Sequence, residues 1–176
     1  MMPEPIIIEA FTSHRLHDAT QLLKHGFPWQ RYLPLGRLSL YFYLLRQRYP
    51  LLGLSRCLGV EETRFWVAVS ATSQQVLGII GLYSKTVDAH ESYWLDWFCV
   101  APCARGQGIG TLLLQFSLTQ ARLAGKQFLR IITSDDPNEN LAQSLYEKHD
   151  FCLISTTQPL HWRQFNIRML YRECKL

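Results

Sequence analysis

The chain has 176 residues, of which 48% are hydrophobic and 18% are charged. This composition is typical of a globular protein and excludes an intrinsically disordered chain, and the length predicts a single domain over residues 1–176. The net charge is +4, and the basic residues form no run. So small an excess does not favour a nucleic-acid partner, although it is compatible with a polyanionic small ligand.

The sequence carries no clear membrane or secretion signal. The longest uncharged stretch, residues 65–84, is interrupted by Ser70 and by the polar residues 72–75, so it does not predict a membrane-spanning helix. The first residues lack the basic and apolar regions of a signal peptide. Five cysteines without a Cys-x-x-Cys pair indicate reduced thiols, and six histidines show no metal-ligand spacing. We therefore expect a cytoplasmic protein with no membrane partner and no metal.

Hydrophobic spacing in the first half of the chain predicts two helices between strands. Ser13 is a candidate cap for the first helix. Pro50 ends the second, because the residue before a proline disfavours the helical conformation. The expected elements are a strand at 6–11, helices at 14–26 and 37–49, and a hairpin of strands 65–71 and 76–83.

In the second half, strands and helices alternate. The first of its two helices carries Ile109, Leu112, Leu113 and Phe116 on one face and ends at Gly125. The second helix follows a capping box, with Asp136 at the N-cap, Pro137 at the first helical position and Glu139 three residues after the cap. The expected elements are a strand at 92–100, a helix at 108–124, a strand at 128–133, a helix to about 149, and strands at 151–157 and 165–171.

This order of elements predicts how the strands pair. Strand, helix and strand within about 40 residues form a right-handed crossover, so strands 92–100 and 128–133 should be parallel. We therefore expect an α/β (α+β) fold. Its mixed, mostly antiparallel sheet would contain a central parallel βαβ crossover and be flanked by helices.

A glycine-rich turn, Ala101 to Gly110, lies between strand 92–100 and the following helix. Gly106, Gly108 and Gly110 let the backbone approach a ligand closely, and the first N–H groups of the helix point outward without partners. A phosphate would be stabilised there, with Arg105 as an adjacent cation. The alternative is a tight connection whose glycines serve packing only. The turn matches neither a Walker A loop, which needs Lys and Ser/Thr after the last glycine, nor a Rossmann fingerprint.

The string WLDWFCVAPCARGQGIGTLLL resembles the central motif of the GNAT superfamily of acyl-CoA-dependent N-acetyltransferases. Arg105, Gly108 and Gly110 match its Arg/Gln-x-x-Gly-x-Gly/Ala core. A second family segment is similar to a helix carrying Ala142, Leu145, Tyr146, Glu147, Lys148 and Phe151. Two departures are Asp150, where the family has Gly, and Glu139, where the family commonly has Asn. Asp tolerates the left-handed conformation expected at position 150.

The resemblance implies that acetyl-CoA binds at this turn. Its pyrophosphate would lie on the backbone of the turn, and its pantetheine arm would pair with an exposed strand edge, which requires the two parallel strands to splay apart. Either asparagine beside Glu139 is a candidate contact. The implied cofactor residues are Phe98, Cys99, Val100, Arg105, Gly106, Gln107, Gly108, Ile109, Gly110, Thr111, Asn138 and Asn140.

Acetyl transfer to an amine requires a base, because an amine of pKa about 10.4 is almost entirely charged at pH 7. The resemblance implies a carboxylate near the thioester as the base. The candidates are Asp96, in strand 92–100, and Glu91, just before this strand; alternatively, Asp96 is a half-exposed strand residue paired with an arginine. Tyr146 matches the family's general acid, which protonates the departing thiolate; alternatively, it is a core tyrosine. Cys99 and Cys103 have no base beside them in sequence, so we expect ordinary thiols and direct transfer.

The resemblance places the acceptor between the first two helices and the last hairpin, residues 25–49 and 158–165. The expected acceptor is a small-molecule or peptide amine. A non-catalytic acyl-CoA sensor on the same fold is the alternative function. The aromatic residues there suit a planar or cationic acceptor, the core, or a homodimer face; they are Phe27, Trp29, Tyr32, Tyr41, Tyr43, Tyr49, His161 and Trp162.

Overall fold

The computed structural model describes residues 4–27, 34–49, 59–158, 160–162 and 165–176. Its centre is a seven-stranded sheet in the order β1-β2-β3-β4-β5-β9-β6, in which β4 and β5 are parallel and the other neighbours antiparallel. The predicted mixed sheet with a central parallel crossover is therefore confirmed. The strands are β1 (Ile6–Ala10), β2 (Val60–Ser70), β3 (Val76–Lys85), β4 (Ser92–Val100), β5 (Phe128–Ser134), β6 (Cys152–Thr156) and β9 (Met169–Lys175), and β7 (Leu160–Trp162) pairs separately with β8 (Phe165–Ile167).

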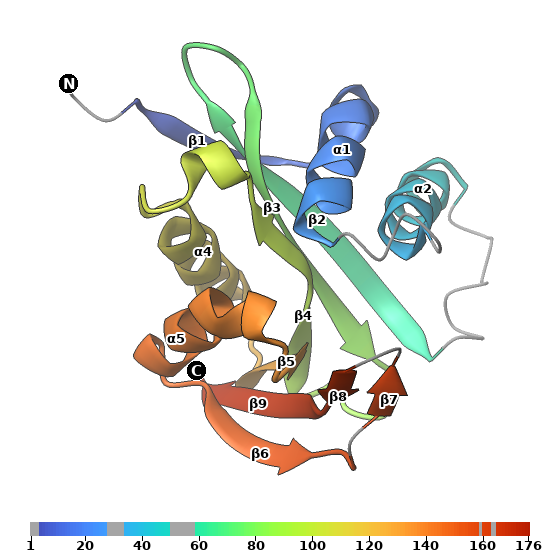
Figure 1. Ribbon diagram of the computed structural model, residues 1–176. Helices are drawn as coiled ribbons and strands as arrows, with labels where there is room; N and C mark the ends of the chain where they lie inside the picture. The colour runs from blue at the N-terminus through green and yellow to red at the C-terminus, as the bar shows by residue number, and fades with distance from the viewer. Residues whose placement is uncertain (1–3, 28–33, 50–58, 159, 163–164) are drawn as a thin grey trace.

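Helices cover both faces of the sheet (Figure 1). Gly78 of β3 faces Leu113 of α4, whereas Cys99 of β4, which lies opposite the next residue of β3, contacts Gly26 of α1. Because neighbouring strand residues point to opposite faces, α1 and α4 lie on different sides. The helices are α1 (Leu16–Gly26), α2 (Leu35–Arg48), α4 (Ile109–Leu123) and α5 (Asn140–Lys148), with short 3-10 segments η1 (Ser13–Arg15), η3 (Pro102–Ala104) and η4 (Pro137–Glu139).

The core lies on both sides of β3, which is buried at every residue from Val76 to Leu82. The predicted apolar face of α4 is correct for Ile109 and Leu113 but wrong for Leu112, which is 39% exposed. The buried face includes Leu114 and Ser117 in place of Leu112, so it is rotated around the helix axis relative to the predicted face. Residues four positions apart share this face. Its remaining members are Leu118 and Ala121.

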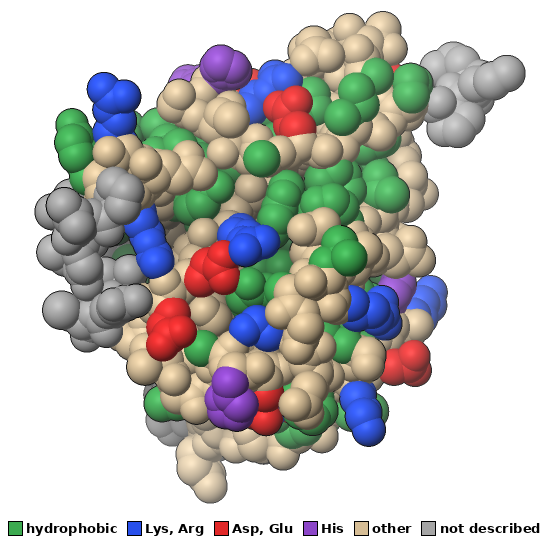
Figure 2. Space-filling view, turned by 180° about the vertical axis from the view of Figure 1, so that it is seen from behind, with side chains coloured by type: hydrophobic (Ala, Val, Ile, Leu, Met, Phe, Trp, Pro, Cys, Tyr) green, Lys and Arg blue, Asp and Glu red, His purple; other side chains and the backbone are tan. Residues whose placement is uncertain are grey.

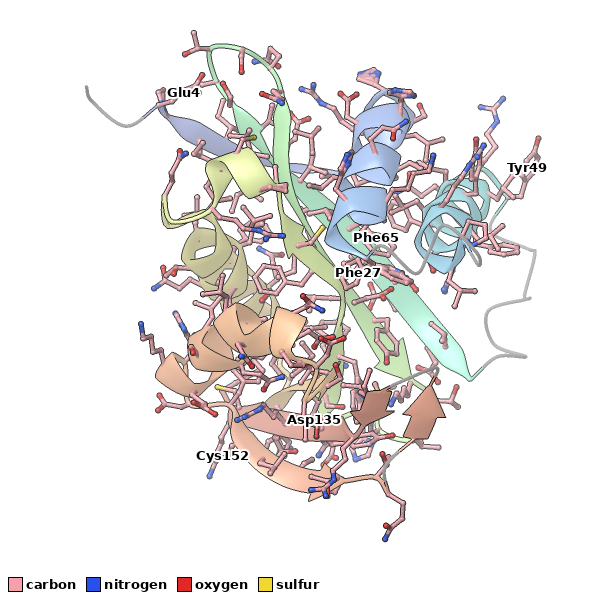
Figure 3. All side chains as sticks on the ribbon, viewed as in Figure 1. Glu4, Phe27, Tyr49, Phe65, Asp135 and Cys152 are labelled. Atoms are coloured by element: carbon pink, nitrogen blue, oxygen red, sulfur yellow. The ribbon has the colours of Figure 1, made fainter. Side chains whose placement is uncertain are left out.

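The surface combines scattered charge with some exposed apolar side chains. On the face shown in Figure 2, basic and acidic side chains are interspersed, so the excess of +4 is not gathered there into one basic patch. Phe42 of α2 is 52% exposed, and Tyr49 projects outward beyond the end of α2 (Figure 3). No helix in the described ranges is long and apolar enough to span a bilayer.

Two predicted helix starts differ in detail from the structure. α1 is preceded by η1, and no side chain caps either segment, so the predicted Ser13 cap is wrong. Asp136 does cap η4, and its Oδ1 accepts a hydrogen bond from the backbone N–H of Asn138 at 2.8 Å. The capping box is wrong, however, because the Glu139 carboxylate accepts hydrogen bonds from Ser134 of β5 instead.

The predicted final strand at 165–171 is also wrong, because the chain forms two strands there. At the break between β8 and β9, Arg168 exchanges hydrogen bonds with Asp135: its backbone N–H donates to Asp135 Oδ1 at 2.7 Å, and its carbonyl accepts from the Asp135 N–H at 3.1 Å. β9 then continues to Lys175 and pairs with both β5 and β6.

Gly81 permits a close approach beneath the site described below. A Cβ atom at Gly81 would lie 2.3 Å from Phe65 Cε1 and 3.1 Å from Asp96 Cβ. We expect Gly81→Ala to lower the free energy of unfolding by about 1–3 kcal/mol through overpacking, measured by urea denaturation. Gly110→Ala is the control, because its nearest neighbour would be at 3.4 Å. An unchanged urea midpoint in Gly81→Ala would mean that the Phe65 ring moves aside at no cost.

Candidate active site

β4 and β5 pair over a short distance and then separate. Their parallel register comprises Ser92 with Phe128, Tyr93 with Leu129 and Trp94 with Arg130, yet β4 continues to Val100 and β5 to Ser134. The splay expected from the sequence is therefore present. It leaves the edge of β4 at residues 98–100 without a β5 partner, as β-augmentation by an amide-bearing ligand requires.

A β-bulge accompanies this separation. Asp96 lies opposite Gly81 and Cys99 lies opposite Ile79, so two residues of β4 oppose one residue of β3. Trp97, inside the bulge, has φ of +33°, a conformation that bulky side chains rarely adopt. Because bulges bend the strand that carries them, this one redirects β4 at the point where the two parallel strands part.

A cavity of about 1010 Å³ occupies the gap. It is lined by consecutive residues 95–98 of β4 and 131–134 of β5. Since consecutive strand residues point to opposite faces, the cavity passes through the sheet. One half opens toward α5 and the glycine-rich turn, and the other opens toward α1 and α2. We call these the turn half and the helix half.

The glycine-rich turn has the backbone geometry that the sequence predicts. Gly106 and Gly108 have φ of +75° and +81°, and no heavy atom lies within 4 Å of a Cβ position at either residue. Exposed Arg105 lines the turn half, and its Nε donates to the carbonyl of Val100 at 3.3 Å. Ile109, in contrast, is buried in the core. An open, glycine-lined backbone at the start of a long helix can hold a phosphate.

The remaining predicted cofactor residues differ in placement. Phe98 and Asn138 line the cavity, whereas exposed Asn140 does not. Gln107 is exposed and donates to the carbonyl of Cys103, and partly buried Thr111 lies in the first turn of α4. The structure therefore brings Asn138, rather than Asn140, to the site.

Tyr146 reaches the turn half from α5. It is 4% exposed, packs against Phe98 and Phe151 with ring centroids 6.2 and 5.7 Å away, and lines the cavity. Burial raises the pKa of Tyr146 above its ordinary value, so the hydroxyl stays protonated at neutral pH. Its hydroxyl makes no hydrogen bond to any residue that the structure describes. It is thus positioned to donate a proton into the cavity.

Arg172 of β9 fixes α5, the helix that carries Tyr146. The guanidinium donates to Gln143 Oε1 at 2.8 Å, to Glu147 Oε1 at 2.8 Å and to the carbonyl of Phe151 at 3.0 Å. Asp150, at the end of this helix, has φ of +61°, the left-handed conformation expected at that position. The helix is therefore tied to the sheet at several points.

Asp96 approaches the cavity from the other face of the sheet. Asp96 is partly buried where it lines the cavity, and loss of solvent around its carboxyl group raises the pKa of Asp96 to about 7, although a hydrogen bond from the backbone of Trp97 partly opposes the shift. A carboxyl with this pKa is close to half ionised at neutral pH, which suits a general base.

The alternative base, Glu91, does not reach the cavity. It lies just before β4 and forms an ion pair with Arg130 at 2.9 Å, and Arg130 also pairs with Asp88 and Glu173. Because pairing holds β4 to β5 near Glu91, the gap opens only further along, beside Asp96. The geometry thus favours Asp96.

The two cysteines near the site lack the character of nucleophiles. Burial raises the pKa of the Cys99 thiol to about 12, and its Sγ points toward the carbonyl of Leu22 in α1. Since the thiolate is the reactive form, Cys99 is inert at neutral pH. Cys103 is exposed in η3 and does not line the cavity.

The helix half contains some residues that the sequence indicated and others that it did not. Of the segment predicted for the acceptor, residues 25–27, 39, 42, 43, 45 and 46 line the cavity. Trp29 and Tyr32 lie outside the described residues, as do the side chains of His161 and Trp162. Thr63, Tyr83 and Met169 were missed, because no local sequence signal shows that strands so far apart in the chain meet at one cavity.

Comparison with known proteins assigns the family. Residues 61–152 match the family model described as "Acetyltransferase (GNAT) domain", which is more than half of the chain. The matched segment runs from β2 to the start of β6 and so includes β4, the glycine-rich turn and α5. The chain belongs to the GNAT acetyltransferase family, and the resemblance inferred from its motifs is confirmed.

Individual relatives agree with this assignment, one by sequence identity over a short segment and others by similarity of the whole fold. The chain is 38% identical over 58 residues to the Arabidopsis thaliana protein "GCN5-related N-acetyltransferase 6, chloroplastic"; this match spans 33% of the chain and 19% of the relative's length. An N-acetyltransferase from Staphylococcus aureus has the same fold, with a TM-score of 0.73 and 14% identity over 97% of this chain and 98% of that one. A GNAT family acetyltransferase from Elizabethkingia anophelis, whose structure contains acetyl-CoA, also has this fold. Its TM-score is 0.62 and its sequence identity 18%, over 97% of this chain and 98% of that one.

Proposed function

We propose that this protein transfers an acetyl group directly from acetyl-CoA to a primary amine. The observation that carries the proposal is the cavity through the sheet, which has a buried tyrosine on one face and a carboxyl of pKa about 7 on the other. The turn half suits acetyl-CoA: Gly106 and Gly108 leave room for phosphates, Arg105 supplies positive charge, and residues 98–100 offer a strand edge. The helix half is left for the amine.

The first chemical step is removal of the ammonium proton. A lysine-like amine is only about 0.04% neutral at pH 7, a penalty of roughly 4.6 kcal/mol. The Asp96 carboxylate accepts this proton, and the raised pKa makes it a stronger base than an exposed aspartate. The neutral nitrogen can then attack the thioester carbonyl carbon.

The second step is departure of the thiolate. As the carbon–sulfur bond breaks, the Tyr146 hydroxyl donates its proton to the sulfur. The second proton of the attacking nitrogen then returns to the Tyr146 oxygen, and Asp96 releases the first proton to solvent, which restores both residues. The buried, protonated state of Tyr146 supports this role, because an ionised tyrosine could not donate. The products are the acetylated amine and CoA.

Cofactor class is tested by calorimetry with acetyl-CoA and with NAD. We expect acetyl-CoA to bind and NAD not to bind. Arg105→Ala should weaken acetyl-CoA binding by only roughly 3- to 10-fold, because the backbone N–H groups of the turn remain. Exposed Arg122, in the last turn of α4, is the matched control, and Arg122→Ala should bind as the wild type does. Binding of NAD but not of acetyl-CoA would contradict the proposal.

Catalysis itself is tested by measuring CoA release with a panel of amines. The panel contains alkylamines, polyamines, aminoglycosides and peptides with free N-termini. We expect release with at least one class. Tight acetyl-CoA binding with no release across the whole panel would instead favour a non-catalytic acyl-CoA sensor.

A further inference from the structure

We infer that the helix half accepts amines that carry a single positive charge on an apolar body, and that it discriminates against polyamines and aminoglycosides. This inference rests on the proposed function, because it names the acceptor class for the same cavity. It follows from the number of acidic side chains that can face an acceptor and from the residues that form the walls.

The first argument is a count of carboxylates. All 14 acidic residues of the chain fall within the described residues, so none is hidden in the remaining segments. Three of them line the cavity: Asp96, Asp136 and Glu139. A polycationic acceptor would need a carboxylate for each buried ammonium group, because an unpaired buried charge is costly.

Two of these three carboxylates belong to the turn half and are already engaged. Asp136 Oδ1 accepts hydrogen bonds from both the backbone N–H and the side-chain amide of Asn138, each at 2.8 Å. Glu139 accepts from the backbone N–H and the hydroxyl of Ser134 at 3.0 and 2.9 Å. Only Asp96 therefore remains to meet an ammonium group in the helix half.

The second argument is the character of the walls. Phe27 and Trp97 pack edge to face with ring centroids 5.4 Å apart, and Figure 3 shows Phe27 close to the sheet beneath α1. Tyr43, Ile132 and Met169 add further apolar surface. Aromatic and aliphatic walls stabilise an apolar body through burial and ring contacts.

A third argument is the positive charge of Arg46 in the helix half, which also disfavours a second ammonium group. Arg46 lines the cavity, and its guanidinium donates to the backbone carbonyl of Glu61. An ammonium group at the far end of an acceptor would face this cation and no carboxylate other than Asp96. A methyl or phenyl group at the same place would be buried favourably.

Two amines of equal length test the inference directly. Hexylamine and 1,5-diaminopentane have the same number of heavy atoms and differ only in a terminal methyl against a terminal ammonium. With saturating acetyl-CoA and the wild-type protein, kcat/KM from CoA release should favour hexylamine by at least roughly 30-fold. Phenethylamine should be turned over at least as well as hexylamine.

A pair of variants tests the cause. Thr63 lines the cavity from β2 and lies opposite Tyr83, on the same face of the sheet as Asp96. Thr63→Asp supplies a second carboxylate, and Thr63→Asn has the same shape without the charge. The ratio of diamine to monoamine kcat/KM should be at least roughly 10-fold higher in Thr63→Asp than in Thr63→Asn.

The outcomes separate this inference from the proposed function. If CoA is released but 1,5-diaminopentane is used as well as hexylamine, the inference is overturned and acetyl transfer stands. If neither these amines nor any other of the panel releases CoA, both proposals are overturned. If either Thr63 variant fails to fold, the wild-type comparison of the two amines decides alone.

Discussion

Asp96→Asn is expected to lower kcat/KM roughly 100- to 10,000-fold, the usual range for loss of a general base. The same change should raise the melting temperature at pH 8. The pKa of Asp96 is about 7 against an ordinary 3.8, so the folded protein binds more protons than the unfolded chain between these values. Stability from this group therefore falls as pH rises from about 4 to about 7, by at most about 4 kcal/mol. An asparagine does not carry this cost.

Kinetics over a range of pH checks the expected loss of kcat/KM, and calorimetry over the same range checks the expected gain in melting temperature. Wild-type kcat/KM should rise with pH through an inflection near 7 that the variant lacks, and the gain in melting temperature should be larger at pH 8 than at pH 5. Glu91→Gln is the matched control. It changes the sequence's other candidate base and should keep kcat/KM within about threefold, because Glu91 does not line the cavity. A large loss of activity in Glu91→Gln with little loss in Asp96→Asn would instead identify Glu91 as the base.

The parts of the site that sequence predicts are those specified locally. Gly106 and Gly108 need no distant partner to adopt positive φ, and Asp150 tolerates a left-handed helix end through its own side chain. Strand, helix and strand in succession likewise define the parallel pair of β4 and β5. The glycine-rich turn and the parallel strands beside the turn half are therefore specified within a short stretch of chain.

The parts that sequence misses depend on contacts between distant residues. Asp135 divides the predicted last strand by binding Arg168, and Ser134 draws Glu139 away from its capping box. The helix half is assembled from α1, α2, β2, β3, β5 and β9, so its walls are defined only after the sheet forms. The raised pKa of Asp96 likewise results from burial by these elements.

Tyr146→Phe should lower kcat roughly 100- to 10,000-fold while leaving KM for acetyl-CoA nearly unchanged. The substitution keeps the ring that packs against Phe98 and Phe151 and removes only the hydroxyl. Because that hydroxyl forms no hydrogen bond among the described residues, its loss should leave the melting temperature close to that of the wild type. Steady-state kinetics and thermal unfolding of the same preparation provide both measurements.

A second tyrosine gives the opposite pattern and so separates a chemical role from a structural one. Tyr93 of β4 is buried, donates to Glu62 Oε2 at 2.6 Å and does not line the cavity. Tyr93→Phe removes a hydrogen bond to a charged group, so it should lower the free energy of unfolding by about 1–3 kcal/mol and leave kcat within about threefold. A Tyr146→Phe protein that keeps wild-type turnover would refute the acid role. One that loses stability as Tyr93→Phe does would show that the Tyr146 hydroxyl supports the fold.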